Sequence, residues 1–378
     1  MGVGATSCVE PVRPGASALI ATLRAVALRG LARMYRAEER QFVFRARRAG
    51  LGVRLEGRSP RYTAIALIGL AGESEWDVRE ILQGDRPADV CGQLLSDVPW
   101  VLNLGDVALT TWAACAVAHP RRETALRRLL TLLEERGRCE TVALAWAVSA
   151  LCAAGASPVA EQNRARWARR LCAALDERSG LFPHEAGAAG SRWRGHVACF
   201  ADQVYPILAV AQYAKLTADV RALEAANRCA QRICAIMGRA GQWWWHYDVR
   251  TGRVIEGYPV YAVHQDGMAP MALLGLHEAG GADHRAEIER GLAWLHGAPE
   301  LAGQSLIDER AGMIWRKVAR REPRKLVRRA QAVASYLHPK LRLPGMDFLF
   351  PPGVIDDECR PYHLGWLLYA WSRERVLA

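Results

Sequence analysis

Two segments of the chain place ionisable side chains directly ahead of an apolar helical stretch. The first is FADQVYPILAVAQY from Phe200, and the second is HQDGMAPMALLGL from His264. In both, a proline follows near the start, where a helix tolerates it because the first backbone amides have no acceptor inside the helix. Carboxylate, imidazole and phenol groups are common proton-transfer groups in enzymes. The polar candidates of the two segments are Asp202, Gln203, Tyr205, His264, Gln265 and Asp266.

Four of these side chains are candidates for catalysis. Asp202 and Asp266 would be the acid and the base, and His264 and Tyr205 would assist proton transfer. The two glutamines would contact the substrate. A pair of carboxylates is the usual machinery of glycoside hydrolysis, in which the carboxylate separation decides between retention and inversion.

A carboxylate at a helix start also has a purely structural use. It can cap the helix by accepting free backbone amides at the positive end of the helix dipole. This interpretation applies to Asp202 and Asp266, and also to Asp106 and Glu140, which open two other apolar segments. Acids that converge in one concave pocket favour function instead, because they push their pKa values apart. Asp106 is therefore a candidate for substrate binding.

The segment WWWHYDVRTGRVIEGYPVYAVHQDG, from Trp243 to Gly267, is the richest in polar and aromatic side chains. Its central turn predicts a short hairpin or loop insertion near residues 242–263. Flat aromatic faces beside carboxylates suit sugar rings. The segment is therefore either a substrate-binding element or a structural hairpin that closes the opening. Its substrate-binding candidates are Trp244, His246, Tyr258 and Tyr261.

Near the C-terminus, GVIDDECRPYHLGW places three acids, Asp356 to Glu358, just before another apolar helix that has His363 in its first turn. Neighbouring acids can bind a cation or supply a general acid, although an exposed acidic turn is the commoner arrangement. His363 is a candidate for substrate binding. No cysteine or histidine pair has metal-ligand spacing, so the sequence predicts neither a bound metal nor a cofactor.

The elements that must position these residues are six apolar segments with helical spacing. They open at Arg61, Gly105, Cys139, Phe200, His264 and Pro361, and more charged helical stretches lie between most of them. This alternation predicts an all-α array of about six helical hairpins with the apolar helices forming an inner ring. The polar starts of the inner helices would then gather at one opening.

The chain of 378 residues is expected to comprise a flexible segment at 1–17 and one domain at 18–378. A long or broken amphipathic helix is expected over 18–49. Three outer helices are followed by a glycine and a bulky apolar residue. This pattern predicts that Phe182 and Trp315 pack as aromatic plugs, each filling the space where the chain turns over the edge of the ring. The triple tryptophan from Trp243 exceeds what one plug requires. The other charged outer helices are expected over 73–97, 121–136, 159–176, 218–237 and 284–296.

The formal net charge is +11, and part of it lies in the tract from Arg316 to Arg329, where eight of fourteen residues are basic. Such a tract can make a weak contact with an anionic surface, or it can be a solvated outer helix or loop. Aromatic residues are not interleaved with it and no reader motif is present, so the sequence does not predict nucleic-acid binding.

The first 17 residues lack the apolar run of a secretory signal, and no later run approaches the roughly 18 to 20 apolar residues that span a bilayer. We therefore expect no transmembrane segment and a cytoplasmic location. Ten cysteines are scattered along the chain, several of them inside apolar runs. This distribution predicts buried free thiols rather than disulfides or structural zinc.

With six apolar helices alternating with outer ones, residues 15–378 resemble the α/α toroid of six-hairpin glycosidases and of their lyase and epimerase relatives. The resemblance implies a pocket at the starts of the inner helices in which carboxylates, histidine and tyrosine carry out the reaction. In this sequence Asp202, Asp266, His264 and Tyr205 occupy such positions. The resemblance also implies an enzyme that acts on a sugar or oligosaccharide by hydrolysis, elimination or epimerisation.

Two other classes remain open. Terpenoid cyclases and protein prenyltransferases are also toroids, but the DxDD motif of one and the zinc ligands of the other are not found in this sequence. An isoprenoid enzyme would need an aromatic pocket with a basic patch for a diphosphate, whereas an acid-rich opening would repel that group. The third class is a non-catalytic binding scaffold, which is favoured if the acids are individually capped, far apart and exposed.

Overall fold

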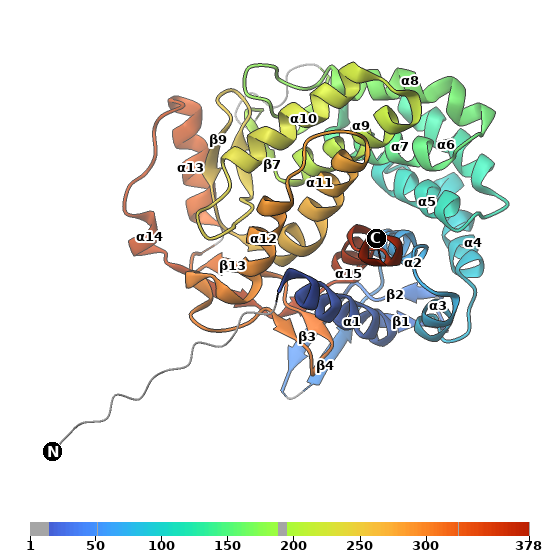
Figure 1. Cartoon of the computed structure of the whole chain (residues 1–378), viewed down its shortest axis with the longest axis horizontal. Helices are drawn as coiled ribbons and strands as arrows, with labels where there is room; N and C mark the ends of the chain where they lie inside the picture. The colour runs from blue at the N-terminus through green and yellow to red at the C-terminus, as the bar shows by residue number, and fades with distance from the viewer. Residues whose placement is uncertain (1–14, 51, 188–194, 324, 378) are drawn as a thin grey trace.

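Six inner helices form a closed ring in the computed structural model, which describes residues 15–50, 52–187, 195–323 and 325–377 (Figure 1). Each inner helix packs on the next, and the last returns to the first. One turn of π-helix, η2 (His264–Met268), precedes the fifth inner helix and packs on the sixth. The inner helices are α2 (Pro60–Leu70), α5 (Leu104–Ala116), α7 (Thr141–Ala153), α9 (Ala201–Thr217), α11 (Ala269–Glu278) and α15 (Pro361–Ala370). The predicted α/α toroid is confirmed.

The outer helices cover the ring, as the charged stretches of the sequence predict. Helix α10 buries only the stripe Ala222, Ala226, Cys229, Ala230 and Ile233, whereas almost every residue of α7 is buried. A helix with apolar residues all round belongs inside, and one with a single apolar stripe belongs at the surface. The outer helices are α1 (Ala16–Met34), α3 (Glu75–Ile81), α4 (Pro87–Asp97), α6 (Arg122–Glu134), α8 (Pro158–Cys172), α10 (Val220–Ala235) and α12 (Arg285–Gly297).

The first helix is shorter than the sequence predicts. Helix α1 ends at Met34, and four strands follow: β1 (Tyr35–Arg36), β2 (Gln41–Phe42), β3 (Arg45–Ala49) and β4 (Gly52–Glu56). The expected helix over 35–49 is therefore wrong. In β3 only Ala46 is fully buried, and Arg47 to Ala49 are exposed. The strand is held by antiparallel pairing with β4 and β15. Of the expected flexible segment, residues 1–14 lie outside the described residues, and Ala16 already belongs to α1.

Short antiparallel strands surround the starts of the inner helices. β5 (Cys139–Glu140) leads into α7, β7 (Val197–Cys199) into α9 and β15 (Glu358–Cys359) into α15. The predicted insertion near 242–263 is confirmed as a hairpin of β8 (His246–Asp248) and β9 (Arg253–Glu256), to which β7 adds a third strand. The remaining strands are β6 (Glu185–Ala186), β10 (Val260–Tyr261), β11 (Ile307–Asp308), β12 (Met313–Ile314), β13 (Lys317–Arg320) and β14 (Pro352–Asp356).

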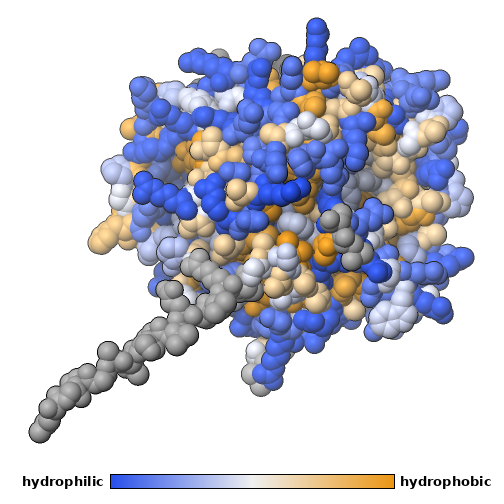
Figure 2. All heavy atoms as spheres, viewed as in Figure 1, coloured by the Kyte–Doolittle hydropathy of each residue, from blue (hydrophilic) through white to orange (hydrophobic). Residues whose placement is uncertain are grey.

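The remaining elements lie around the ring. Figure 1 shows α13 (Leu326–Leu337) and α14 (Met346–Leu349) outside it on the side of β9. On the face shown in Figure 2, hydrophilic side chains cover most of the surface, with smaller apolar areas between them. Phe182, Trp243 and Trp315 are all fully buried, so the two predicted aromatic plugs are confirmed and Trp243 is a third. Within the described residues, no helix is long and apolar enough to span a membrane.

The ring closes through an unusually close contact between α2 and α15. A Cβ atom on Gly69 would collide with the backbone carbonyl of Gly365, and a Cβ atom on Gly365 would lie 2.8 Å from the carbonyl oxygen of Ile65. Such short separations are not accommodated without backbone movement. Glycine at these two positions therefore allows the backbones of the first and last inner helices to touch.

We predict that Gly69→Ala destabilises the protein by about 3 kcal/mol, because an extra methyl group in a closely packed interface forces the backbones apart. Denaturant unfolding would measure the change in the free energy of unfolding. Gly297→Ala is the matched control, since Gly297 ends α12 with open space around it. The control should be neutral or slightly stabilising, as alanine is the better helix former. Equal stability of the two variants would contradict the proposed closure.

Candidate active site

A cavity of about 290 Å³ lies at the starts of the inner helices and is the central space of the opening. Four of the inner helices contribute to it, namely α2, α7, α9 and α15, together with the turn of π-helix η2 that precedes α11. Half of the residues that line it carry an aromatic ring, and among the described residues that line it none is a carboxylate. The aromatic side chains are Tyr62, Trp146, Tyr205, Trp245, Tyr261, His264 and Tyr362, and the two cationic ones are Arg61 and Arg316.

Two polar aromatic residues of this central cavity, His264 and Tyr205, are uncharged near pH 7. Burial lowers the pKa of His264 to about 3, so its imidazole is neutral near pH 7. Its ring stacks on Trp245 with the centroids 5.5 Å apart. Burial raises the pKa of Tyr205 well above the usual range, and its ring meets Trp146 edge to face. Both groups shape the cavity and offer neutral hydrogen-bonding atoms rather than charge.

The two arginines are each held by a carboxylate outside the central cavity. Arg61 Nε lies 2.5 Å from Asp106 Oδ1, and Arg316 Nη1 lies 2.5 Å from Glu358 Oε1. Glu358 is nearly fully buried and also contacts Arg45 and Arg360. Burial pushes the pKa of Glu358 upward, but the attraction of Arg316 and Arg360 outweighs it and the pKa falls below its usual value. The interpretation of this acid as part of an exposed turn is therefore wrong.

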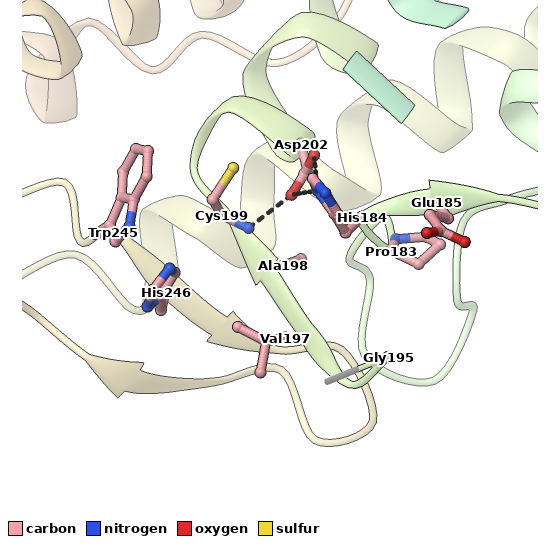
Figure 3. A pocket seen from close by; sticks show the side chains of 10 residues that line it. All are labelled: Pro183, His184, Glu185, Gly195, Val197, Ala198, Cys199, Asp202, Trp245 and His246. Carbon is pink, nitrogen blue, oxygen red and sulfur yellow. Dashed lines mark hydrogen bonds and ion pairs between the residues drawn. The ribbon is translucent and has the colours of Figure 1, made fainter. Parts of the chain in front are cut away.

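A second cavity, of about 370 Å³, lies between β7, β8 and the start of α9 (Figure 3). Its polar centre is the pair of His184 and Asp202. The Nδ1 atom of His184 is 3.2 Å from both carboxylate oxygens of Asp202, and the backbone amide of Cys199 donates to the same carboxylate at 2.7 Å. Figure 3 shows Trp245 and His246 on the wall opposite this pair.

The pair combines a buried acid with an accessible base. Asp202 is fully buried, whereas about half of the His184 side chain is exposed. The hydrogen bond that the imidazole donates to the Asp202 carboxylate raises the pKa of His184 above its ordinary value. A histidine with a raised pKa next to a cavity can donate and recover a proton near neutral pH. The arrangement is therefore suited to general acid and base chemistry.

The cavities adjoin one another across the opening. Trp245 lines both the central and the second cavity. A third cavity, of about 410 Å³, shares Arg61 and Tyr62 with the central one and is also lined by Asp106. Together they form a row that is long enough for more than one ring-sized group, because each cavity alone has the volume of a small ligand site.

The structure brings six of the predicted residues to this row of cavities. Tyr205, Tyr261 and His264 line the central cavity, Asp202 and His246 the second, and Asp106 the third. The cap interpretation holds only in part. Asn103 rather than Asp106 caps α5, and Glu140 makes no side-chain cap bond, whereas Asp202 does accept a backbone amide just before α9.

The other predicted residues lie in the walls. Asp266 is fully buried, and its carboxylate oxygens lie 2.8 and 2.9 Å from Nε2 of His363. Burial raises the pKa of Asp266. The acid and base candidates Asp202 and Asp266 therefore do not share one described cavity.

Four of the substrate-binding candidates have structural partners instead. The side-chain amide of Gln203 accepts from the backbone of Phe182 at 2.8 Å and donates back to it at 3.0 Å. Trp244 packs edge to face against Tyr258, whose hydroxyl is 3.2 Å from Glu300. The remaining candidate, Gln265, donates its side-chain amide to the backbone carbonyl of Tyr261 at 3.3 Å.

Several site residues were missed by the sequence interpretation, among them Arg61, which was recognised only as the start of an apolar segment. His184 follows the plug residue Phe182 in SGLFPHE, and Trp245 is the last of the triple tryptophan, whose excess over one plug was the available signal. Arg316 begins the basic tract that was expected to be a solvated outer helix or loop. That expectation is wrong for 316–320, where Arg316 lines the central cavity and β13 begins at Lys317.

Comparison with known proteins supports the fold. Neither a protein-family model nor a curated protein matches the sequence. Among solved structures, an unsaturated glucuronyl hydrolase specific for heparin is similar, with 14% identity, 94% of this chain and 96% of that chain covered, and a TM-score of 0.59. The unsaturated glucuronyl hydrolase from Bacillus sp. GL1, which is responsible for glycosaminoglycan degradation, has 12% identity and a TM-score of 0.60, with 95% of this chain and 97% of that chain covered. A possible GH105 family member from Salmonella enterica has 11% identity, coverage of 97% and 96%, and a TM-score of 0.55. The chain therefore shares the toroid fold of these structures, and at such low sequence identities the similarity extends to the fold alone.

We predict that His184 titrates above the value of an unperturbed histidine and that Asp202→Asn lowers its pKa. NMR titration of the ring resonances would measure both values. Because the folded-state pKa is raised, the stabilisation from this pair is complete below the unfolded pKa of about 6.5. It is lost as the pH rises through the folded-state pKa. The stability difference between wild type and Asp202→Asn should therefore shrink over that interval, and a constant difference would contradict the pairing.

Proposed function

We propose that the protein is a carbohydrate-active enzyme that hydrolyses an oligosaccharide at an acidic terminal sugar. The observation that carries the proposal is the aromatic, arginine-lined central cavity that adjoins the His184 and Asp202 pair across Trp245. The similar structures are described as unsaturated glucuronyl hydrolases, one specific for heparin and one responsible for glycosaminoglycan degradation. A glucuronyl group carries a carboxylate, which is the kind of ligand that these arginines suit.

The lining supports a sugar substrate on physical grounds. Aromatic faces pack on the C–H faces of sugar rings, and neutral Tyr205 and His264 can exchange hydrogen bonds with hydroxyl groups. Arg61 and Arg316 enter from different elements, α2 and the segment before β13, so that they approach the cavity separately. A row of cavities on both sides gives an oligosaccharide room to extend.

The His184 and Asp202 pair would perform the proton transfer. His184 is the member exposed to the cavity, and it would donate a proton to the reacting group while Asp202 holds the imidazole in position and balances its charge. In this proposal Asp202 is a positioning residue for His184 rather than the acid or base expected of it. Asp266 is assigned to the wall through its contact with His363.

One observation favours a second candidate, an isoprenoid enzyme. The central cavity is aromatic and cationic rather than acid-rich, as a diphosphate site would require. Each arginine is already paired with a carboxylate, however, and Glu358 is shared by several arginines. This balance suits one carboxylate better than the several charges of a diphosphate. Incubation with isoprenoid diphosphates, with product analysis by mass spectrometry, tests this candidate directly.

We expect release of reducing ends from oligosaccharides that carry an unsaturated glucuronyl terminus. Asp202→Asn and His184→Gln should each lower kcat by about 100-fold or more, with KM little changed, because a positioned proton donor is lost. Glu134→Gln is the matched control, since Glu134 is an exposed carboxylate on the outer helix α6 and does not contribute to the raised pKa of His184. Activity in either site variant equal to that of the control would refute the assigned role.

We further predict that Arg61→Gln raises KM for the acidic substrate by about tenfold, because one charge-assisted contact is worth about 1.5 to 3 kcal/mol. The methyl ester of the same substrate lacks the negative charge and should show little change in KM. Arg86→Gln serves as the control, because Arg86 is an exposed arginine at the start of the outer helix α4. An equal change in KM for the acid and for the ester would mean that Arg61 does not bind the substrate carboxylate.

A further inference from the structure

Three side chains of different chemistry meet on the outside of the ring, away from the row of cavities. Cys234 lies in the last turn of α10, His284 directly precedes α12, and Glu287 lies in the first turn of α12. Each offers one ligand atom, and these three atoms lie within 4.8 Å of one another. None of the three residues lines any of the three cavities of the opening.

The donor set is that of a zinc site. Thiolate sulfur, imidazole nitrogen and carboxylate oxygen are the ligands that Zn²⁺ prefers, at about 2.0 to 2.3 Å in tetrahedral geometry. Such bond lengths place neighbouring ligand atoms about 3.5 Å apart. Side-chain rotations that draw the three atoms together by about 1 Å would therefore complete the site, with water as the fourth ligand.

The backbone around the three residues is already fixed. The side chain of Asn227 on α10 accepts a hydrogen bond from the amide of Ala282 at 2.8 Å, which holds the connection before α12 against α10. His284 accepts backbone amides of the first turn of α12 through its carbonyl oxygen. The ligand positions are therefore set by ordinary helix geometry, as a preformed metal site requires.

The side chains themselves have only weak partners. The Nε2 atom of His284 is buried and has no hydrogen-bond partner among the described residues. The Nδ1 atom of His284 and the guanidinium of Arg290 lie 3.6 and 3.4 Å from the two carboxylate oxygens of Glu287. Surface contacts at these distances contribute little to stability. A metal ion could therefore replace them at small cost.

We propose that Cys234, His284 and Glu287 bind one zinc ion, which clips the outer helix of the fourth hairpin to that of the fifth. The clip is structural, because it joins two outer helices, α10 and α12, and none of its three residues lines a cavity of the opening. It also departs from the sequence-based expectation of no metal. One cysteine and a histidine fifty residues apart form no recognisable motif, and only the fold brings them together.

Cobalt(II) substitution tests the site directly, because tetrahedral Co²⁺ bound to a thiolate gives visible absorption and a near-ultraviolet charge-transfer band. We expect one Co²⁺ per chain with both signals, and displacement by Zn²⁺. Cys234→Ser should remove the charge-transfer band, and His284→Gln should weaken binding at least tenfold. Cys172→Ser is the matched control, since Cys172 also ends an outer helix, α8, and is similarly half-buried.

A second measurement covers variants that fold poorly. Zinc added to the full-length wild-type protein should raise Tm by several degrees through binding to the native state, and a chelator should reverse the rise. The rise should persist in Cys172→Ser and vanish in Cys234→Ser. If Co²⁺ gives no thiolate band with the wild type, or if Cys172→Ser removes the band and Cys234→Ser does not, the proposed site is wrong.

Discussion

Closure of the ring between α2 and α15 is the contact on which the opening depends. Gly69 and Gly365 let the two backbones touch, and this close approach brings Tyr62 and Tyr362, at the starts of the same helices, to a ring separation of 4.9 Å. Both tyrosines line the central cavity. One wall of the site is therefore built by helices that are about 300 residues apart in the chain. A bulkier residue in the contact would separate the wall as well as the helices.

The charge of the opening depends on one buried carboxylate. Glu358 is shared by Arg45, Arg316 and Arg360, and it orients Arg316 toward the cavity. Burying this cluster carries a desolvation penalty, which is recovered only if every member remains paired. Arg45 and Arg316 have second carboxylate partners in Glu56 and Asp356. The positive charge that faces the central cavity is that of Arg61 and Arg316, which line it. The positive ends of the inner helix dipoles point to the same opening and reinforce it.

The sequence predicts the scaffold better than the site. Hydrophobic periodicity identifies inner and outer helices because a helix buried on all sides, such as α7, has a composition unlike that of α10. The same periodicity fails over 35–49, where short strands that pair with one another or with β4 and β15 replace the expected helix. It also places Asp202 and Asp266 equally at helix starts, although the turn of π-helix at η2 and the contact with His363 leave Asp266 inside the wall. The direction in which a side chain points around a helix axis is decided by packing, which one sequence does not reveal.

Three acids near the opening, Asp106, Asp202 and Asp266, have a cationic or imidazole partner, and this pairing explains which group remains available for chemistry. Asp106 is paired with Arg61, Asp202 with His184, and Asp266 with His363. Unpaired carboxylates there would cancel the attraction of the opening for an anion. His264 is neutral because it is buried, and His363 is enclosed with its acid. His184 is the partner that is both half-exposed and raised in pKa, so it can exchange a proton with a ligand while the surrounding positive charge still holds an anionic group.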